Sequence, residues 1–145
     1  MTDVSEPEPG GMDLLVNIDV PDLAAAIAFY TRAFGLTLTR RLGPEAAELS
    51  GWPARIYLLQ KPVGSVGAGD DRRRYERHWT PVHLDVVVDD LEAALARAIA
   101  AGARTETEIR TAAWGKIVVL SDPFGHGVCL IQFLGRGYDE IAEPG

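Results

Sequence analysis

Hydrophobic and polar residues alternate along two well-separated stretches of the chain. Between Leu14 and Val20 the apolar residues Val16 and Ile18 fall on one face of a predicted strand, and the segment from Val82 to Val88 alternates in the same way. A period of two residues is typical of a strand with one buried face. We therefore expect each stretch to be a strand packed on a helix.

A period close to that of an α-helix follows each alternating stretch. Asp22 is placed to cap a helix over residues 22–34, which Gly35 ends, and Asp89-Asp90 opens a second helix that ends at Gly102. The predicted buried faces are Leu23, Ile27, Tyr30 and Phe34 in the first helix, and Leu91, Leu95, Ala98 and Ile99 in the second.

The two halves of the chain repeat one another. Aligning Val20 to Leu23 with Val88 to Leu91 pairs Leu15 with His83, and aligning the ends of the halves pairs Tyr57 with Cys129. Two copies are too few for a solenoid, so we expect one closed domain of two βαβββ units. The remaining strands are predicted at Leu36–Arg41, Ala46–Ser50 and Arg55–Gln60 in the first unit, and at Ala103–Ile109, Ile117–Leu120 and Gly127–Phe133 in the second.

These patterns predict a single domain over residues 12–134, with unit one at 12–60, a connection at 61–80 and unit two at 81–134. Residues 1–11 and 135–145 are expected to be tails. The connection carries a basic run at Arg72, Arg73, Arg74 and Arg77. A solvated loop and an anion-steering rim are both open interpretations of that run.

The composition of the chain excludes some kinds of function. The chain has 145 residues, a net charge of −7 and one cysteine, so it can bury a core without an internal disulfide. The acidic balance argues against general nucleic-acid binding. No apolar run approaches the roughly 20 residues of a membrane helix. We expect a cytoplasmic protein with no membrane segment.

The tandem βαβββ pattern and the D-P-F-G-H turn at residues 122–126 resemble the vicinal oxygen chelate superfamily, which contains glyoxalase I, extradiol dioxygenases, and bleomycin- and fosfomycin-resistance proteins. The likeness runs from Met12 to Leu134. It implies an α+β fold in which two tandem units form curled mixed sheets around a shared cleft, often in a homodimer.

The resemblance also implies four positions for metal ligands, at Leu15, Tyr57, His83 and Cys129. Leu15 has no donor atom, Tyr57 would have to bind as a phenolate, and a lone cysteine is more often a buried apolar residue. Only His83 is an ordinary ligand. We therefore expect no cofactor, and the alternative is a divalent metal ion held through His83 and Cys129.

His83 is the candidate catalytic residue, as a general base or a hydrogen-bonding group, with Asp85 too far along the strand to be assumed its partner. A histidine remaining from a lost metal site is the alternative. The residues predicted to face the cleft are mostly apolar, which suits a flat or apolar small molecule. The ligand-binding candidates are Leu15, Asn17, Tyr57, His83, Asp85, Trp114, Cys129 and Ile131.

Two functions follow from this reasoning. One is metal-free binding of a small apolar or aromatic molecule, as in the drug-sequestering resistance proteins. The other is a metal-dependent lyase, isomerase or dioxygenase of the same superfamily, or a metal-free catalyst with His83 as base. A regulatory module that keeps only its interaction surface stays open as a third.

Overall fold

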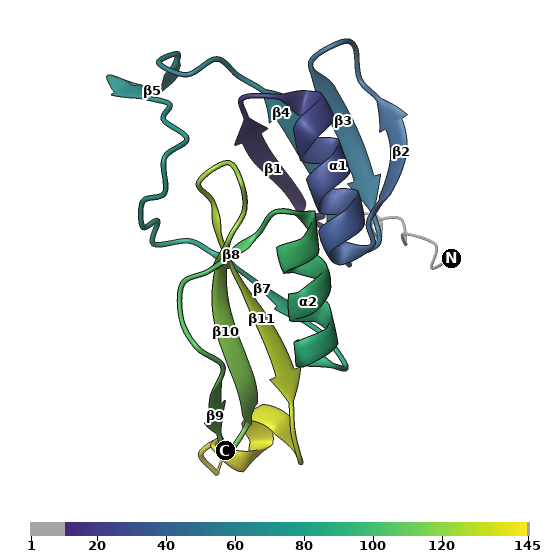
Figure 1. Ribbon diagram of the computed structural model, residues 1–145, viewed down its shortest axis with the longest axis vertical. Coiled ribbons are helices and arrows are strands. Elements are labelled where there is room, and N and C mark those ends of the chain that lie inside the picture. The colour runs from purple at the N-terminus through teal and green to yellow at the C-terminus, as the bar shows by residue number, and fades with distance from the viewer. Residues whose placement is uncertain (1–10, 145) are drawn as a thin grey trace. The chain divides into compact units, whose positions relative to one another are not determined.

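The computed structural model describes residues 11–144, and the chain divides into two compact units at the boundary between Tyr75 and Glu76. Unit 1 precedes this boundary and unit 2 follows it (Figure 1). Residues 1–10 of the predicted N-terminal tail and Gly145 lie outside the described residues.

Unit 1 is a four-stranded sheet with one helix against it (Figure 1). The strand order is β1-β4-β3-β2; β1 runs parallel to β4 and the other neighbours are antiparallel. This is the βαβββ plan that the sequence predicts. Its elements are β1 (Leu15–Val20), α1 (Leu23–Phe34), β2 (Thr37–Arg41), β3 (Ala46–Ser50) and β4 (Arg55–Gln60).

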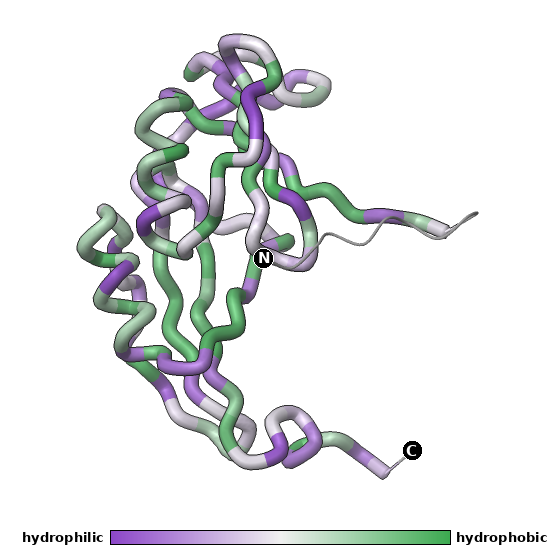
Figure 2. Tube along the Cα trace, turned by 90° about the vertical axis from the view of Figure 1, so that its right-hand side faces the viewer, coloured by the Kyte–Doolittle hydropathy of each residue, from purple (hydrophilic) through white to green (hydrophobic). Residues whose placement is uncertain are grey.

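Unit 2 repeats the plan, with the order β7-β11-β10-β8 and β7 parallel to β11. The duplicated α+β fold is therefore confirmed. The long strands β10 and β11 are predominantly hydrophobic (Figure 2). The elements are β7 (Leu84–Val87), α2 (Leu91–Ala101), β8 (Arg104–Thr105), β9 (Arg110–Ala112), β10 (Gly115–Ser121), β11 (Gly127–Phe133) and the 3-10 helix η1 (Gly137–Glu140).

Both helices begin and end where the sequence places their caps. The side chain of Asp22 accepts from the backbone N–H of Ala25, and Asp90 accepts from Ala93, each at 3.1 Å. These carboxylates satisfy N–H groups that have no partner inside the helix. Gly35 ends α1 in the left-handed conformation with φ 68°, which glycine adopts without steric cost.

Two glutamines at equivalent positions show which face of each sheet the helix covers. The backbone N–H of Leu23 donates to Oε1 of Gln60, and that of Leu91 donates to Oε1 of Gln132, both at 2.9 Å. Because side chains alternate along a strand, residues an odd number of positions from these glutamines face away from the helix. Tyr57 on β4 and Cys129 on β11 are such residues.

Three details differ from the prediction. Of the expected strand Ala103–Ile109 only β8 is formed, and β9 follows beyond its predicted end; both short strands pair with β10. The expected loop contains a hairpin of β5 (Val66–Ala68) and β6 (Asp71–Arg72). Ile99 is 48% exposed, and Ala94 is buried on α2 with Leu91 and Ala98.

Arg73 holds the hairpin to the rest of unit 1. Its Nε lies 2.7 Å from Oδ2 of Asp19 on β1, and its Nη1 donates to the carbonyl of Val66 at 2.6 Å. In unit 2, Arg77 pairs with Glu106 at 2.6 Å. Two arginines of the basic run are thus neutralised by carboxylates of their own units. Within the described residues, no helix is both long and apolar enough to cross a membrane.

Candidate functional site

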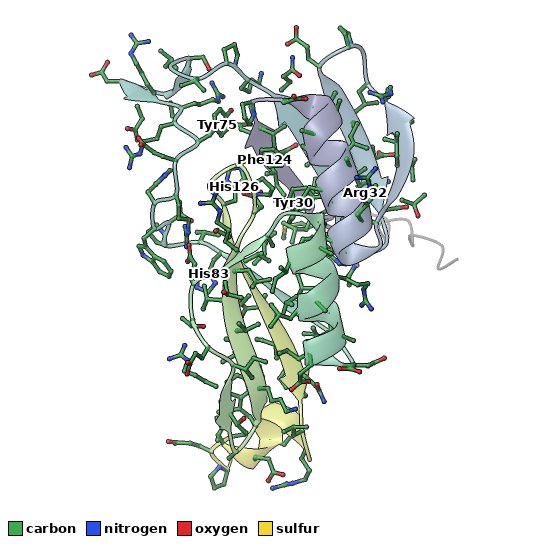
Figure 3. The ribbon with its side chains drawn as sticks, viewed as in Figure 1. Tyr30, Arg32, Tyr75, His83, Phe124 and His126 are labelled. Carbon is green, nitrogen blue, oxygen red and sulfur yellow. The ribbon has the colours of Figure 1, made fainter. Side chains whose placement is uncertain are left out.

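Three side chains of unit 2 that can bind a metal or a proton lie together at the start of its sheet. His83 immediately precedes β7 (Figure 3), Asp85 is on β7, and Cys129 lies on β11 as the direct register partner of Asp85. One nitrogen, oxygen or sulfur atom from each residue lies within 4.8 Å of the others. Parallel pairing of β7 with β11 creates this group from residues far apart in the sequence.

The partner of His83 corrects the sequence-based expectation. Nδ1 of His83 lies 3.4 Å from Oδ1 of Asp85, so the two side chains form a close pair. Residues two positions apart are separated by about 7 Å along a strand but point to the same face. The imidazole and carboxylate side chains are long enough to close that separation, which spacing along the chain alone does not reveal.

Cys129 is kept as a thiol by its surroundings. Burial raises its pKa to about 11, with further contributions from the charge of Asp85 and from a hydrogen bond to that carboxylate. The thiolate is the nucleophilic form of cysteine, so a raised pKa argues against a free nucleophile. A cysteine nucleophile also needs an imidazole to take its proton, and the imidazole of His83 is paired with Asp85 at 3.4 Å.

Apolar side chains continue the same face of unit 2. Val87 follows Asp85 by two residues, and Ile131 and Phe133 follow Cys129 by two and four, so all point away from α2. Ile131 is 2% exposed, whereas Val87 is 57% and Phe133 is 38% exposed. The polar group therefore lies next to accessible apolar surface.

Trp114 lies farther along this sheet. Its ring packs 5.3 Å from that of Tyr138 and 6.4 Å from that of Phe133, measured between centroids. Phe133 pairs with Gly115, while Cys129 pairs with Val119 four residues away, about 13 Å along the strand. Trp114 thus joins an aromatic cluster at the far end of the apolar surface and does not reach His83.

Unit 1 places a different polar network on the equivalent face. Glu48 is buried, and its carboxylate accepts from the hydroxyl of Tyr57 at 2.6 Å and from Nε of Arg40 at 3.0 Å. Thr39 donates to the same carboxylate at 2.8 Å. The hydrogen bonds from Tyr57 and Arg40 lower the pKa of Glu48 to about 2. Glu48 is therefore ionised at every physiological pH.

The hydrogen bond to Glu48 limits the chemistry of the Tyr57 phenol. Donation to Glu48 is the largest cause that raises the pKa of Tyr57 above its ordinary value, so the phenol keeps its proton. A protonated phenol is a poor metal ligand. Asn17 is the register partner of Tyr57, and Leu15, which is 47% exposed, faces the same side. In unit 1 these candidates offer a hydrogen-bonding and apolar surface, and the position of Tyr57 offers no anionic donor.

Glu48 was not among the candidates, although the sequence contains a signal for it. It is the charged residue in the strand A-A-E-L-S, at a position that alternation places away from α1. Antiparallel pairing of β3 with β4 sets it directly opposite Tyr57. Knowledge of the strand register would have found it.

The residues of unit 2 fit a divalent ion, while those tested in unit 1 do not. An imidazole, a carboxylate and a thiol are all donors that zinc accepts, and three protein ligands leave a position open for substrate. Asp85 thus raises the number of candidate ligands above the two, His83 and Cys129, that the sequence suggested.

Most of the chain matches known sequences. A model of the glyoxalase-like domain matches residues 15–131. The chain is 33% identical over 115 residues to the Mycobacterium bovis protein Mb0911c, a match that covers 74% of each chain. It is also 33% identical to Rv0887c of Mycobacterium tuberculosis, of which the match covers 66%.

Solved structures share the fold. A glyoxalase/bleomycin resistance protein/dioxygenase family enzyme from Burkholderia phytofirmans superposes with a TM-score of 0.65 at 21% identity, over 83% of this chain and 97% of that one. The fosfomycin resistance protein FosX from Listeria monocytogenes gives 0.66 at 16% identity, over 89% and 96% of the two chains.

Proposed function

Because the chain belongs to the glyoxalase-like domain family, we propose that it binds a small apolar or aromatic molecule on the face of unit 2 opposite α2. One observation carries this proposal: Val87 and Phe133 are exposed beside the polar group of His83, Asp85 and Cys129. Apolar surface with a few convergent polar groups is the usual composition of a small-molecule site. The name of the Listeria relative, a fosfomycin resistance protein, is in keeping with a small-molecule role.

Each residue has a distinct part in this site. Val87, Ile131 and Phe133 remove apolar surface of the ligand from water, which contributes about 25 cal/mol for each Å² buried. His83 hydrogen-bonds to one polar group of the ligand. Asp85 faces its Nδ1, which leaves Nε2 as the nitrogen that would bond to the ligand. Trp114 extends the surface for a longer, aromatic ligand.

Thermal unfolding tests this proposal. The full chain, treated with a chelator, is screened against small aromatic and apolar molecules, and a ligand at 100 times its dissociation constant should stabilise it by about 2.7 kcal/mol. Val87→Asp should abolish the stabilisation and His83→Ala should weaken it. Ile99→Asp is the matched control, because Ile99 is equally apolar and 48% exposed but lies on α2.

Equal ligand binding by Val87→Asp and the wild type would reject this face as the site. Loss of binding in Ile99→Asp as well would indicate a general effect of the added charge. Circular dichroism of each variant excludes loss of fold as the cause.

A second function, a metal-dependent lyase, isomerase or dioxygenase, is favoured by a separate observation. Three donor atoms converge in unit 2 within 4.8 Å. His83, Asp85 and Cys129 would hold the ion, and a bound ion would supply Lewis-acid activation of a chelating substrate. Val87 and Phe133 would orient that substrate by its apolar part. Turnover that depends on added metal and is lost in Asp85→Asn would establish this function.

A further inference from the structure

We infer that unit 2 alone forms a cation site for zinc-like divalent ions, with Asp85 as a ligand beside His83 and Cys129. This inference deepens the second function proposed above and rests on it for any catalytic role, but not for the binding of the ion. Its new element is Asp85. The resemblance implies ligands from the first and last strands of both units, and Asp85 is not one of those four positions.

The register of the sheet explains why Asp85 takes this part. Its partner in the parallel pairing of β7 with β11 is Cys129, so the two side chains leave the sheet side by side on the face away from α2. His83, two residues earlier, approaches the same carboxylate to 3.4 Å. All three donors therefore come from two adjacent strands.

The equivalent positions of unit 1 explain why the donors are confined to unit 2. Asn17 and Tyr57 are paired as Asp85 and Cys129 are. An amide replaces the carboxylate there, and the phenol donates to Glu48 at 2.6 Å. Leu15 stands where unit 2 has His83. The positions of unit 1 that match the three donors thus offer no anionic group.

Charge and access are both suitable. The side chains of His83 and Asp85 are 40% and 38% exposed, so an ion in solution can reach them. Binding replaces the thiol proton of Cys129, which passes to solvent as the metal–sulfur bond forms. The carboxylate and the thiolate then balance the two positive charges. Two basic residues of unit 2, Arg110 and Arg77, act on Cys129 through their charge, and Arg77 is itself paired with Glu106 at 2.6 Å.

The donor set favours a soft or borderline ion. Thiolate and imidazole select zinc or cobalt over magnesium and calcium, which prefer oxygen ligands alone. Cobalt(II) is a useful probe, because coordination by a thiolate gives an intense charge-transfer absorption that zinc lacks. The test therefore needs neither a substrate nor an activity.

The experiment is a titration of the chelator-treated full chain with cobalt(II), followed by absorption. The wild type should develop the thiolate band and saturate at one ion per chain, and zinc should remove the band by competition. Cys129→Ser should abolish it. Asp85→Asn should keep the band but weaken binding by more than about 10-fold, because loss of a carboxylate that only supports a ligand already costs about 10–100-fold.

His78→Gln is the matched control, because His78 belongs to unit 2 but is not in the three-donor group; it should bind as the wild type does. Asp85→Ser is a second variant without the carboxylate, for use if Asp85→Asn does not fold. Absence of the band in the wild type would overturn the site. Unchanged affinity in folded Asp85→Asn and Asp85→Ser would overturn the role of Asp85.

The outcomes separate this inference from the proposed functions. A cobalt band without turnover of any substrate supports the ion site and rejects the metal-dependent enzyme. Absence of the band leaves the thermal-unfolding test of apolar ligand binding unaffected, because that test is performed after chelation.

Discussion

Asp85 and Cys129 are direct partners in the parallel pairing of β7 with β11, and their side-chain donor atoms lie within 4.8 Å of each other. Asn17 and Tyr57 hold the same relationship in the parallel pairing of β1 with β4. The duplication has thus preserved the positions and changed the chemistry. Unit 2 presents donors that an ion can bind, and unit 1 presents a phenol committed to Glu48.

The network around Glu48 predicts a pH dependence of stability. Its pKa falls from an ordinary 4.5 to about 2 in the folded chain. Because the folded pKa is the lower one, this contribution is fully present above pH 4.5 and is lost as the pH falls towards 2. Urea midpoints measured at pH 7 and pH 3 should therefore differ more for the wild type than for Glu48→Gln.

Tyr57→Phe is the control for that measurement. It removes the hydroxyl that donates to Glu48 but leaves the pairing with Arg40 at 3.0 Å. Its pH dependence should be intermediate between those of the wild type and Glu48→Gln. Identical slopes for all three proteins would show that Glu48 is not stabilised as an anion.

The helix caps predict how much stability is lost when each capping aspartate is replaced. Asp22→Ala and Asp90→Ala each remove a side chain that accepts from a backbone N–H at 3.1 Å. Each should lower the free energy of unfolding by about 1 kcal/mol. Asp89→Ala, one residue before the second cap, should change it by less than about 0.5 kcal/mol. Chemical denaturation measures all three, and an equal loss in Asp89→Ala would contradict the assignment of the cap.

The caps were predictable from sequence because they are local. An aspartate before an apolar periodic segment and a glycine after it define a helix without reference to any other part of the chain. The duplication supplied the rest of the topology, since one unit served as a template for the other. The strand pairs Asn17 with Tyr57 and Asp85 with Cys129 agree with the two alignments made from the sequence.

The parts that could not be predicted depend on contacts across strands. Alternation could not show that β10 has two short partners, because residues 104–112 are too polar to reveal where pairing breaks. Spacing along β7 gave no ground to assume that Asp85 is the partner of His83, whereas side-chain length closes that distance. Glu48 becomes visible as the partner of Tyr57 only once the register of β3 and β4 is known.

Arg73 predicts the local stability of the β5–β6 hairpin. Its side chain contacts Asp19 at 2.7 Å and both Ser65 and Val66 in the hairpin, at 3.2 and 2.6 Å. The backbone N–H of Gly64 donates to the carbonyl of Arg73 at 2.8 Å, so its exchange reports opening of the hairpin. Arg73→Ala should speed that exchange about tenfold, since the side-chain contacts no longer oppose opening. The exposed neighbour supplies the control: Arg74→Ala should leave the exchange rate unchanged. Equal rates in both variants would show that backbone pairing alone holds the hairpin.

Substitution of Gly115 should cause the largest loss of stability among these variants. Gly115 begins β10 with φ 155°, and a Cβ there would overlap the carbonyl oxygen of Gln132 and lie 3.0 Å from Cα of Phe133. Both neighbours are backbone atoms of β11, so they cannot move aside as a flexible side chain would. Gly115→Ala should therefore lower the free energy of unfolding by about 2–4 kcal/mol, as conformational strain and overpacking combine.

A variant at Gly43 separates conformational strain from overpacking. The φ of Gly43 is 74°, so alanine is strained there as well, but nothing lies within 4 Å of an added Cβ. Gly43→Ala should cost only the conformational part, about 1–2 kcal/mol. The difference between the two variants, measured by urea unfolding, is then the cost of forcing β10 and β11 apart beside Phe133. Equal losses would mean that the strands yield at this end, and the ligand surface proposed at Phe133 would then be adjustable rather than rigid.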